Sequence, residues 1–305
     1  MASSIGVRVY QAYVTQRRSY KPLKIDDPKI ANPAPTFLKG FISKNVSINQ
    51  RSDIERSWYF EEKPNTNLNG SHGYVHYGTF GFESNLVDTK TKVKNYRRQS
   101  TDVEEIPLFY EIWFPKSADY GLIAFQSFQG RSCVQIVMSR MIEEFEKANP
   151  GHSLRFKKLL PTDAKSTFFA GAPVKGLRLL KRNAPSDLTD QYLGKDAYGG
   201  FDYEINIRAK RKASLGPLGD VSKSLPKNSA GVIVHEGIEF DQAIADIRVG
   251  TRIRPVHVFG ASGDAGVIDL TDAIQRGADG HPTFSSIAKE TSDILQSFHG
   301  ALSGN

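Results

Sequence analysis

Residues 71–83 read SHGYVHYGTFGFE, and this stretch decides the fold class. Tyr74 and His76 fall on one side of an alternating pattern, and Val75 and Tyr77 fall on the other. A period of two indicates a β-strand, because successive side chains of a strand point to opposite faces of the sheet. The interspersed glycines indicate a bulge or a close backbone approach within this strand.

Aromatic and β-branched residues continue the pattern further along the chain. Residues 106–114 and 122–128 are rich in such residues, which favour strands, and residues 115–121 can form the turn between them. The sequence therefore predicts an antiparallel meander over residues 71–128.

The period changes after Gly130. Apolar side chains now recur at the spacing of an amphipathic helix, with glutamates opposite, at positions Val134, Val137, Met138, Met141, Ile142 and Phe145. Ser132 is a candidate N-cap and Pro150 ends the pattern, so we predict a helix over residues 132–148. Helices packed on an antiparallel, aromatic-rich sheet define an α+β fold.

The chain is predicted to contain two regions. A first α+β domain covers residues 1–182, and a smaller α+β region covers residues 201–305, beginning with an alternating strand over residues 201–209. Residues 183–200 combine Pro, Asp and Gly with little periodicity, which is typical of a linker or lid. An amphipathic C-terminal helix is expected from Thr283.

Shorter segments give further expectations. We expect strands over residues 5–14, 41–48, 154–159, 232–234 and 251–259, an exposed loop over residues 210–231, and a short helix after Asp272. Residues 243–249 fit either a helix or a strand.

Positive charge is concentrated in a few segments. Residues 151–182 hold eight bases and one acid, and residues 204–227 hold six bases and two acids, whereas the formal net charge of the whole chain is +7. Such asymmetry indicates a polyanionic or acidic partner. The candidate nucleic-acid-binding residues are Arg155, Lys157, Lys158, Lys175, Arg178, Lys181, Arg182, Arg208, Lys210, Arg211 and Lys212.

Aromatic rings lie among these bases, at Phe156, Phe168 and Phe169. They could stack on exposed nucleic-acid bases or belong to the protein core. Lys90, Lys92 and Lys94 form a further cluster, which could follow a phosphate backbone from a hairpin arm or prevent edge pairing of a strand.

The junction between a predicted strand and the helix is a candidate anion-binding site. Backbone N–H groups at a helix start point outward, and Gln129, Gly130, Arg131 and Ser132 would surround an anion there. An ordinary helix N-cap explains the same residues, since every helix start needs such donors.

Candidates for catalysis are fewer. Glu61, Glu62 and Lys63 contain the E-x-K pattern of metal-dependent nucleases, in which carboxylates hold Mg²⁺ and the lysine orients water. His72 and His76 lie on one predicted strand without a third ligand placed by spacing, so we expect no metal or organic cofactor. Cys133, the single cysteine, is expected to be a buried thiol.

Composition limits the remaining classes. No segment offers eighteen consecutive apolar residues and residues 1–9 contain no apolar block of signal-peptide length, so we expect a cytoplasmic protein without a transmembrane segment. The apolar stripe of the C-terminal helix could pack within the chain or dock on a partner protein or a second copy.

Three functions remain open. The leading prediction is a non-catalytic or regulatory nucleic-acid-binding protein that contacts phosphates with little base specificity, with DNA and RNA unresolved. The alternatives are a metal-dependent nuclease or phosphodiesterase, and an interaction subunit that binds an acidic protein.

Overall fold

The computed structural model describes residues 4–19, 21–65, 69–116, 118–159, 167–184, 201–227, 232–235, 238–260 and 266–303. The chain divides into two compact units. The first unit contains Met1–Ile5, Tyr10–Lys157 and Ile274–Ser292, and the second contains Gly6–Val9, Lys158–Ala273 and Asp293–Asn305. Helices and extensive antiparallel β-structure make the fold α+β, as the sequence predicts.

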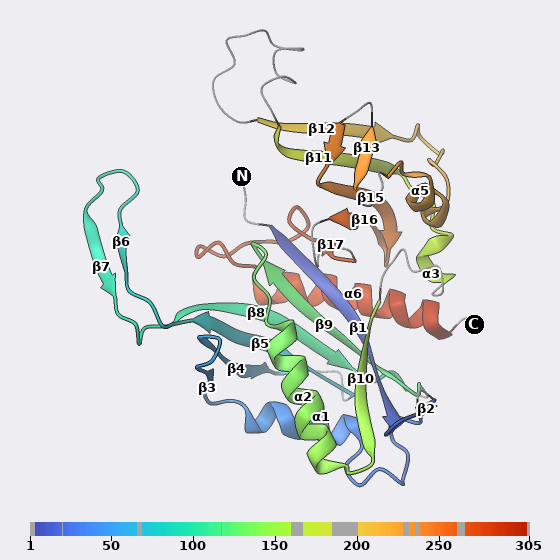
Figure 1. Ribbon diagram of the computed structural model, residues 1–305. Helices are drawn as coiled ribbons and strands as arrows, with labels where there is room; N and C mark the ends of the chain where they lie inside the picture. The colour runs from blue at the N-terminus through green and yellow to red at the C-terminus, as the bar shows by residue number, and fades with distance from the viewer. Residues whose placement is uncertain are drawn as a thin grey trace. The chain divides into compact units, whose positions relative to one another are not determined.

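The first unit is built on a sheet whose strands follow the order β1, β9, β8, β5, β4, β3, with β2 and β10 also paired to β1 (Figure 1). The strands are β1 (Ile5–Gln16), β2 (Pro22–Leu23), β3 (Asn49–Arg51), β4 (Arg56–Lys63), β5 (Gly70–Thr79), β8 (Glu104–Trp113), β9 (Gly121–Phe128) and β10 (His152–Lys158).

Strand β5 lies at the centre of this arrangement. It pairs antiparallel with β4 on one side and with β8 on the other, from Gly70 opposite Trp113 to Thr79 opposite Glu104. A Cβ atom at Gly73 would lie 2.0 Å from the carbonyl oxygen of Glu61, so the backbones approach closely at this glycine. Strands β5, β8 and β9 form the predicted meander, since β8 also pairs antiparallel with β9.

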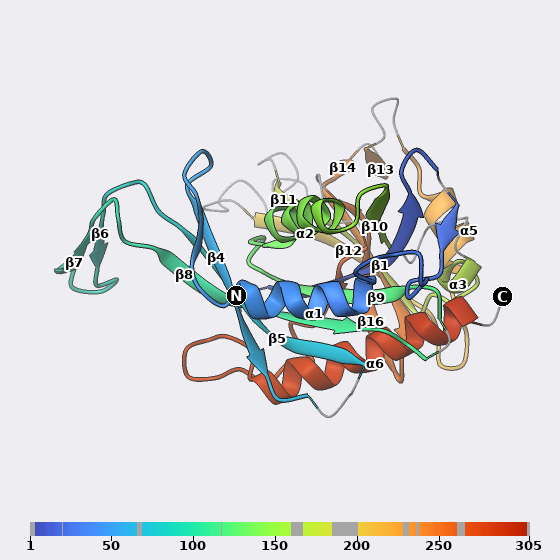
Figure 2. The same cartoon turned by 90° about the horizontal axis from the view of Figure 1, so that it is seen from below.

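Aromatic side chains fill the core on one face of this sheet. Helix α1 (Ala34–Lys44) runs along that face (Figure 2), and its Phe41 ring lies 6.1 Å from Trp58 and 6.0 Å from Phe60. Phe60 also contacts Tyr110 at 5.0 Å, and Phe37 of α1 contacts Phe145 at 5.1 Å. These rings are buried and join the helices to the sheet.

The prediction of a strand over residues 41–48 is wrong, because residues 41–44 belong to helix α1. Phe37, Leu38, Phe41 and Ile42 are buried at helical spacing, and a proline lies in the first turn, where its missing N–H costs nothing. The apolar run at 41–42 therefore belongs to the end of a helix that begins before the expected strand.

Helix α2 (Val134–Ala148) confirms the helix predicted after Gly130, with Val137, Met138, Met141 and Phe145 buried. Its N-cap is Cys133 rather than Ser132, whose Oγ lies 3.4 Å from the backbone nitrogen of Val134. Cys133 is fully buried, and burial raises the pKa of its thiol to about 12. The thiol therefore stays protonated.

Helix α6 (Phe284–Ser303) is the predicted C-terminal helix. In the first unit, Phe284 packs against His72 and Phe109 on the sheet face opposite α1, with ring distances of 5.1 and 5.7 Å. In the second unit, Phe298 contacts Phe169 at 5.0 Å. The stripe residues Ile287, Ile294, Leu295 and Phe298 are all buried within the chain itself.

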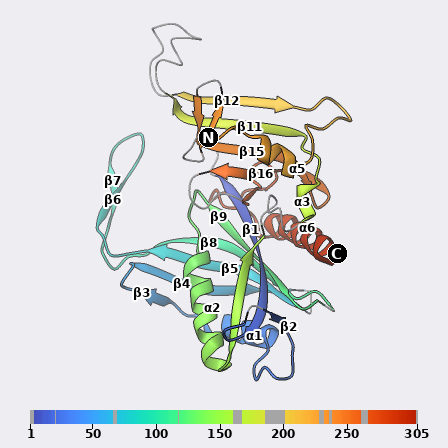
Figure 3. The same cartoon turned by 45° about the vertical axis from the view of Figure 1, so that its right-hand side comes forward.

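A hairpin arm is inserted between β5 and β8. Strands β6 (Ser84–Val87) and β7 (Lys94–Arg98) form a two-stranded sheet of their own, which extends away from β5 and β8 (Figures 1 and 3). Arg98 anchors its base, because the buried guanidinium lies 4.0 Å from the Phe82 ring and pairs with Glu104 at 3.2 Å. The arm itself exposes Leu86, Val87, Val93 and Tyr96.

The second unit contains a sheet in the order β12, β11, β15, β16, β17, followed by Gly6 and Val7 of β1. Its elements are β11 (Gly176–Ala184), β12 (Phe201–Arg208), β15 (Gln242–Val249), β16 (Arg252–Gly260), β17 (Ile268–Asp269), the hairpin β13 (Ile233–His235) with β14 (Ile238–Phe240), and the helices α3 (Thr167–Ala170) and α5 (Leu218–Ser224).

Two further expectations are corrected. The loop expected over residues 210–231 contains α5, whose Leu218 and Val221 are buried after the preceding Pro217. The short helix expected after Asp272 is a series of turns, and residues 243–249 form strand β15. Residues 185–200 of the expected linker lie outside the described residues. No helix in the described part of the chain is long and apolar enough to cross a membrane.

The aromatic core predicts a large difference between two single substitutions. Phe60→Ala should lower the free energy of unfolding by about 3–5 kcal/mol, because it removes a buried ring and leaves a cavity. Leu86→Ala on the exposed arm should change it by less than about 0.5 kcal/mol. Urea unfolding of both variants measures this, and equal losses would contradict the assigned core.

Candidate functional sites

The cations predicted along β11 are balanced by acids of neighbouring strands and loops. Arg178 lies 3.8 Å from Asp246, Lys181 lies 3.6 Å from Asp241, and Arg182 lies 3.2 Å from Asp202. Their charge is therefore largely neutralised within the second unit, although the acids stand far away in the sequence.

The cations where β12 ends have a different environment. Lys175, Arg208, Lys210, Arg211 and Lys212, here called the β12-end cluster, form no ion pair with any acid in the described part of the chain. All except the half-buried Lys175 are exposed. No acid lies between Glu204 and Asp220 in the sequence. Among the residues that the structure describes, this end of the hairpin thus carries positive charge without a paired acid.

The backbone of the β12-end cluster is tied to β11. Register places Gly176 opposite Arg208, and the backbone nitrogen of Ala209 donates to the carbonyl oxygen of Lys175 at 2.9 Å. The Lys175 ammonium donates to the carbonyl oxygen of Ala213 at 2.6 Å, beyond the turn. The cluster is therefore presented by an ordered turn.

The other predicted cations lie on β10. Arg155 and Lys157 are exposed and belong to the first unit, and Lys158 is half-buried and belongs to the second. Of the aromatic rings between the cations, Phe156 is half-buried and Phe169 is buried against Phe298. The side chain of Phe168 lies outside the described residues.

The predicted anion site at residues 129–132 forms a tight turn before α2. Gln129 and Gly130 both adopt positive φ, at 49° and 76°. The Arg131 guanidinium pairs with Glu104 at 2.5 Å. An anion that docks here must therefore compete with a carboxylate for the side chain that would attract it.

A polar network covers the face of the first-unit sheet that packs against Phe284. His76 lies between two carboxylates, with Nε2 at 2.8 Å from Glu61 and Nδ1 at 2.9 Å from Glu105. Glu61 also accepts a hydrogen bond from Lys63, and the Tyr59 ring stacks on His76 at 4.6 Å. The hydrogen bond from Lys63 makes the larger contribution and that from His76 the smaller one, and both lower the pKa of Glu61.

The residues proposed for a nuclease are divided between the two faces of the sheet. Glu61 and Lys63 belong to this network, whereas Glu62 points to the opposite face and accepts a hydrogen bond from Ser71 at 2.8 Å. Strand alternation separates neighbouring residues in this way. The described residues contain no group of three or more His, Cys, Asp or Glu side chains that could hold a metal ion.

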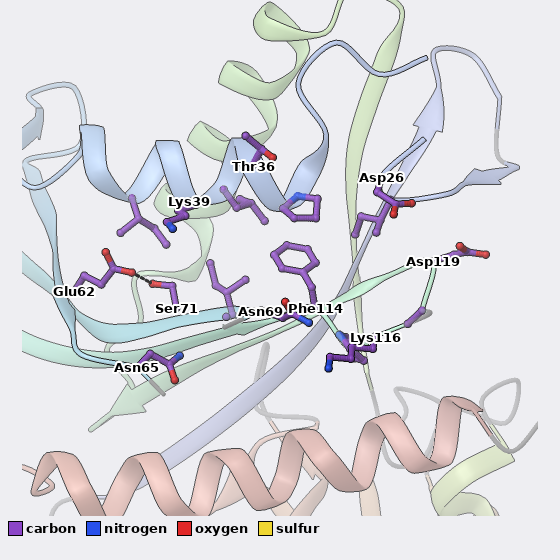
Figure 4. A pocket seen from close by; sticks show the side chains of 18 of the residues that line it. Asp26, Thr36, Lys39, Glu62, Asn65, Asn69, Ser71, Phe114, Lys116 and Asp119 are labelled. Atoms are coloured by element: carbon purple, nitrogen blue, oxygen red, sulfur yellow. Dashed lines mark hydrogen bonds between the residues drawn. The ribbon is translucent and has the colours of Figure 1, made fainter. Parts of the chain in front are cut away.

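A cavity of about 1200 Å³ lies in the first unit between α1 and the ends of β4, β5 and β8 (Figure 4). Its apolar wall includes Leu38, Ile42, Ile112 and Phe114. Its charged lining consists of Lys24, Asp26, Lys39, Glu62, Lys63, Lys116 and Asp119. The sequence does not reveal this cavity, because its wall combines residues from segments that carry no shared motif.

Glu111 on β8 is a second group that sequence reasoning missed. It is 6% exposed, and its Oε2 has no hydrogen-bond partner among the described groups. Burial raises the pKa of this carboxyl group to about 7. Its position opposite His72, within an alternating strand, could have drawn attention to it.

The comparisons with known proteins identify no family. No protein-family model matches this sequence, and a search of curated proteins finds no significant relative.

Burial of Glu111 predicts a pH-dependent stability. The folded chain holds this proton up to about pH 7, whereas the unfolded chain releases it near the usual pKa of 4.5, so stability should fall as pH rises between these values. The fall is of the order of 3 kcal/mol for this group. Glu111→Gln should remove it, as measured by urea unfolding at pH 5, 7 and 8.

The matched control is Glu55→Gln, which neutralises an exposed carboxylate of the same unit. It should leave the pH profile of the wild-type protein unchanged. A Glu111→Gln profile that parallels the wild type would contradict the buried, protonated carboxyl group.

Proposed function

We propose that this protein binds nucleic acid through the β12-end cluster and contacts phosphates with little base specificity. The observation that carries the proposal is that no acid in the described part of the chain forms an ion pair with these five cations, while Arg178, Lys181 and Arg182 on the adjacent strand are all paired. A polyanion would supply the missing counter-charge.

The chemistry of the cluster suits a phosphate backbone. Lys and Arg side chains neutralise phosphates and release condensed counterions, which gives affinity without sequence information. Two arginines add planar donors that match phosphate oxygens in pairs. Phe169 is buried in the core, so its ring is not exposed for stacking on nucleic-acid bases.

The turn that carries the β12-end cluster is attached to β11, and this favours a role of its side chains in ligand binding. Lys175 holds the carbonyl of Ala213, and Lys212 adopts a positive φ of 67° within the turn. Side chains on a fixed backbone lose less conformational freedom on binding than those of a disordered tail.

Two triple substitutions with the same change in net charge test this proposal. Arg208→Gln, Lys210→Gln and Arg211→Gln together should weaken binding and reduce the slope of log K against log salt concentration by about 2–3, because up to three phosphate contacts are lost. Fluorescence anisotropy with single- and double-stranded DNA and RNA between 50 and 200 mM salt measures both quantities.

The control combines Arg178→Gln, Lys181→Gln and Arg182→Gln. Because these cations already have carboxylate partners, the control should change the salt slope by less than about 1. Equal losses in the two triple variants would show that only net charge matters and would refute the assignment to the β12-end cluster. Absence of binding by the wild-type protein at 50 mM salt would refute the function itself.

A further inference from the structure

The cavity of the first unit is large enough for an organic ligand. Its volume of about 1200 Å³ is at least that of typical small-molecule sites. It combines an apolar wall with charged groups at its sides, and Figure 4 shows Glu62 and Ser71 on one side and Asp26 and Asp119 on the other. Such a mixed lining can both hold a ligand and orient it.

A directed chain of hydrogen bonds fixes one carboxylate in this cavity. Ser71 Oγ lies 2.8 Å from Glu62 Oε1 and 3.1 Å from the hydroxyl of Tyr110. An ionised carboxylate can only accept, so the single hydroxyl proton of Ser71 goes to Glu62, and Tyr110 donates to Ser71. Tyr110 is fully buried and Ser71 is 6% exposed, so both are held in place.

The direction of this chain determines what Glu62 can bind. Ser71 has no proton left for a ligand, whereas the Glu62 carboxylate retains accepting capacity and forms no ion pair with a cation in the described part of the chain. The group that satisfies it best is a charged N–H donor, because charge-assisted hydrogen bonds are the strongest. This part of the wall therefore fits an ammonium group.

The rest of the lining favours an apolar body and a negative charge. Ile42, Ile112 and Phe114 supply apolar surface. Lys24, Lys39 and Lys116 line the cavity without ion pairs to the described acids, and they outnumber the two other acids of the lining, Asp26 and Asp119. A ligand with an ammonium group, apolar side chains and a carboxylate uses all three features. This combination is the chemistry of a short peptide with free ends.

We propose that this cavity binds a short apolar peptide, with its amino terminus on Glu62 and its carboxylate near the cavity lysines. The cavity belongs to the first unit, whereas the β12-end cluster belongs to the second. Binding in the cavity and binding of nucleic acid can therefore be tested separately.

The test uses the tripeptide Leu-Leu-Leu and two derivatives, one N-acetylated and one C-amidated, titrated calorimetrically into the full chain. The free tripeptide should bind about tenfold or more tightly than the N-acetylated form, which lacks the ammonium group. It should also bind more tightly than the C-amidated form. Equal affinities within either pair would overturn the corresponding half of the assignment.

Variants connect these preferences with named residues. Glu62→Gln should abolish the preference for a free amino terminus, and the combination of Lys24→Gln, Lys39→Gln and Lys116→Gln should abolish the preference for a free carboxylate. Ser71→Ala should reduce the first preference, because it releases the fixed carboxylate. Glu55→Gln, on an exposed residue outside the cavity lining, should change neither preference.

Urea unfolding of each variant establishes that it is folded before titration, and an unfolded Glu62→Gln protein is replaced by Glu62→Ala. A Glu62 variant that is folded and still prefers the free amino terminus would refute the proposal. Failure of the wild-type chain to bind the free tripeptide at millimolar concentration would refute it as well.

Discussion

Backbone pairing of β5 with β4 and β8 is the constraint on which the first unit depends. This register sends Ser71, Val75 and Tyr110 to the face covered by α1, and sends His72, His76 and Phe109 to the face covered by Phe284. A slip of one residue would exchange the two faces, because the side-chain period is two. Gly73 helps to hold the pairing, since any side chain there would collide with the Glu61 carbonyl.

Folding determines which basic segments of this chain form ion pairs with acidic residues. The segment around Arg178 and the segment around Arg211 are both basic in the sequence, but β15 and the loop before it bring Asp246 and Asp241 beside the first of them. The second segment follows an edge strand, where β11 is the neighbour on one side. The structure therefore distinguishes internal ion pairing from a surface with unmatched charge.

Several elements could be predicted because one periodicity extends over many residues. Helices α2 and α6 and strand β5 each bury a face with a clear spacing, so local pattern and tertiary packing agree. Helix α1 was missed because its apolar pairs also resemble a short strand, and α5 because seven residues carry too little pattern. Local periodicity does not determine such short elements.

The candidate sites were less predictable than the fold. All eleven predicted cations of β10, β11 and the β12 end are visible as sequence clusters. Their partners are not, since Asp241 lies far along the chain from Lys181. The hydrogen-bonded chain from Tyr110 through Ser71 to Glu62 joins three strands. Long-range pairing creates this arrangement, and no spacing rule within one segment encodes it.

The hairpin arm of β6 and β7 has a closed base, because the backbone nitrogen of Gly81 donates to the carbonyl oxygen of Ser100 at 2.8 Å. The chain thus leaves the sheet and returns to it at nearly one point, and the arm's ladder is separate from that of the sheet. Insertions or deletions beyond this closure need not disturb the register of β5 with β8. The arm is therefore a place where the length of this protein can change during evolution without displacing the paired strands.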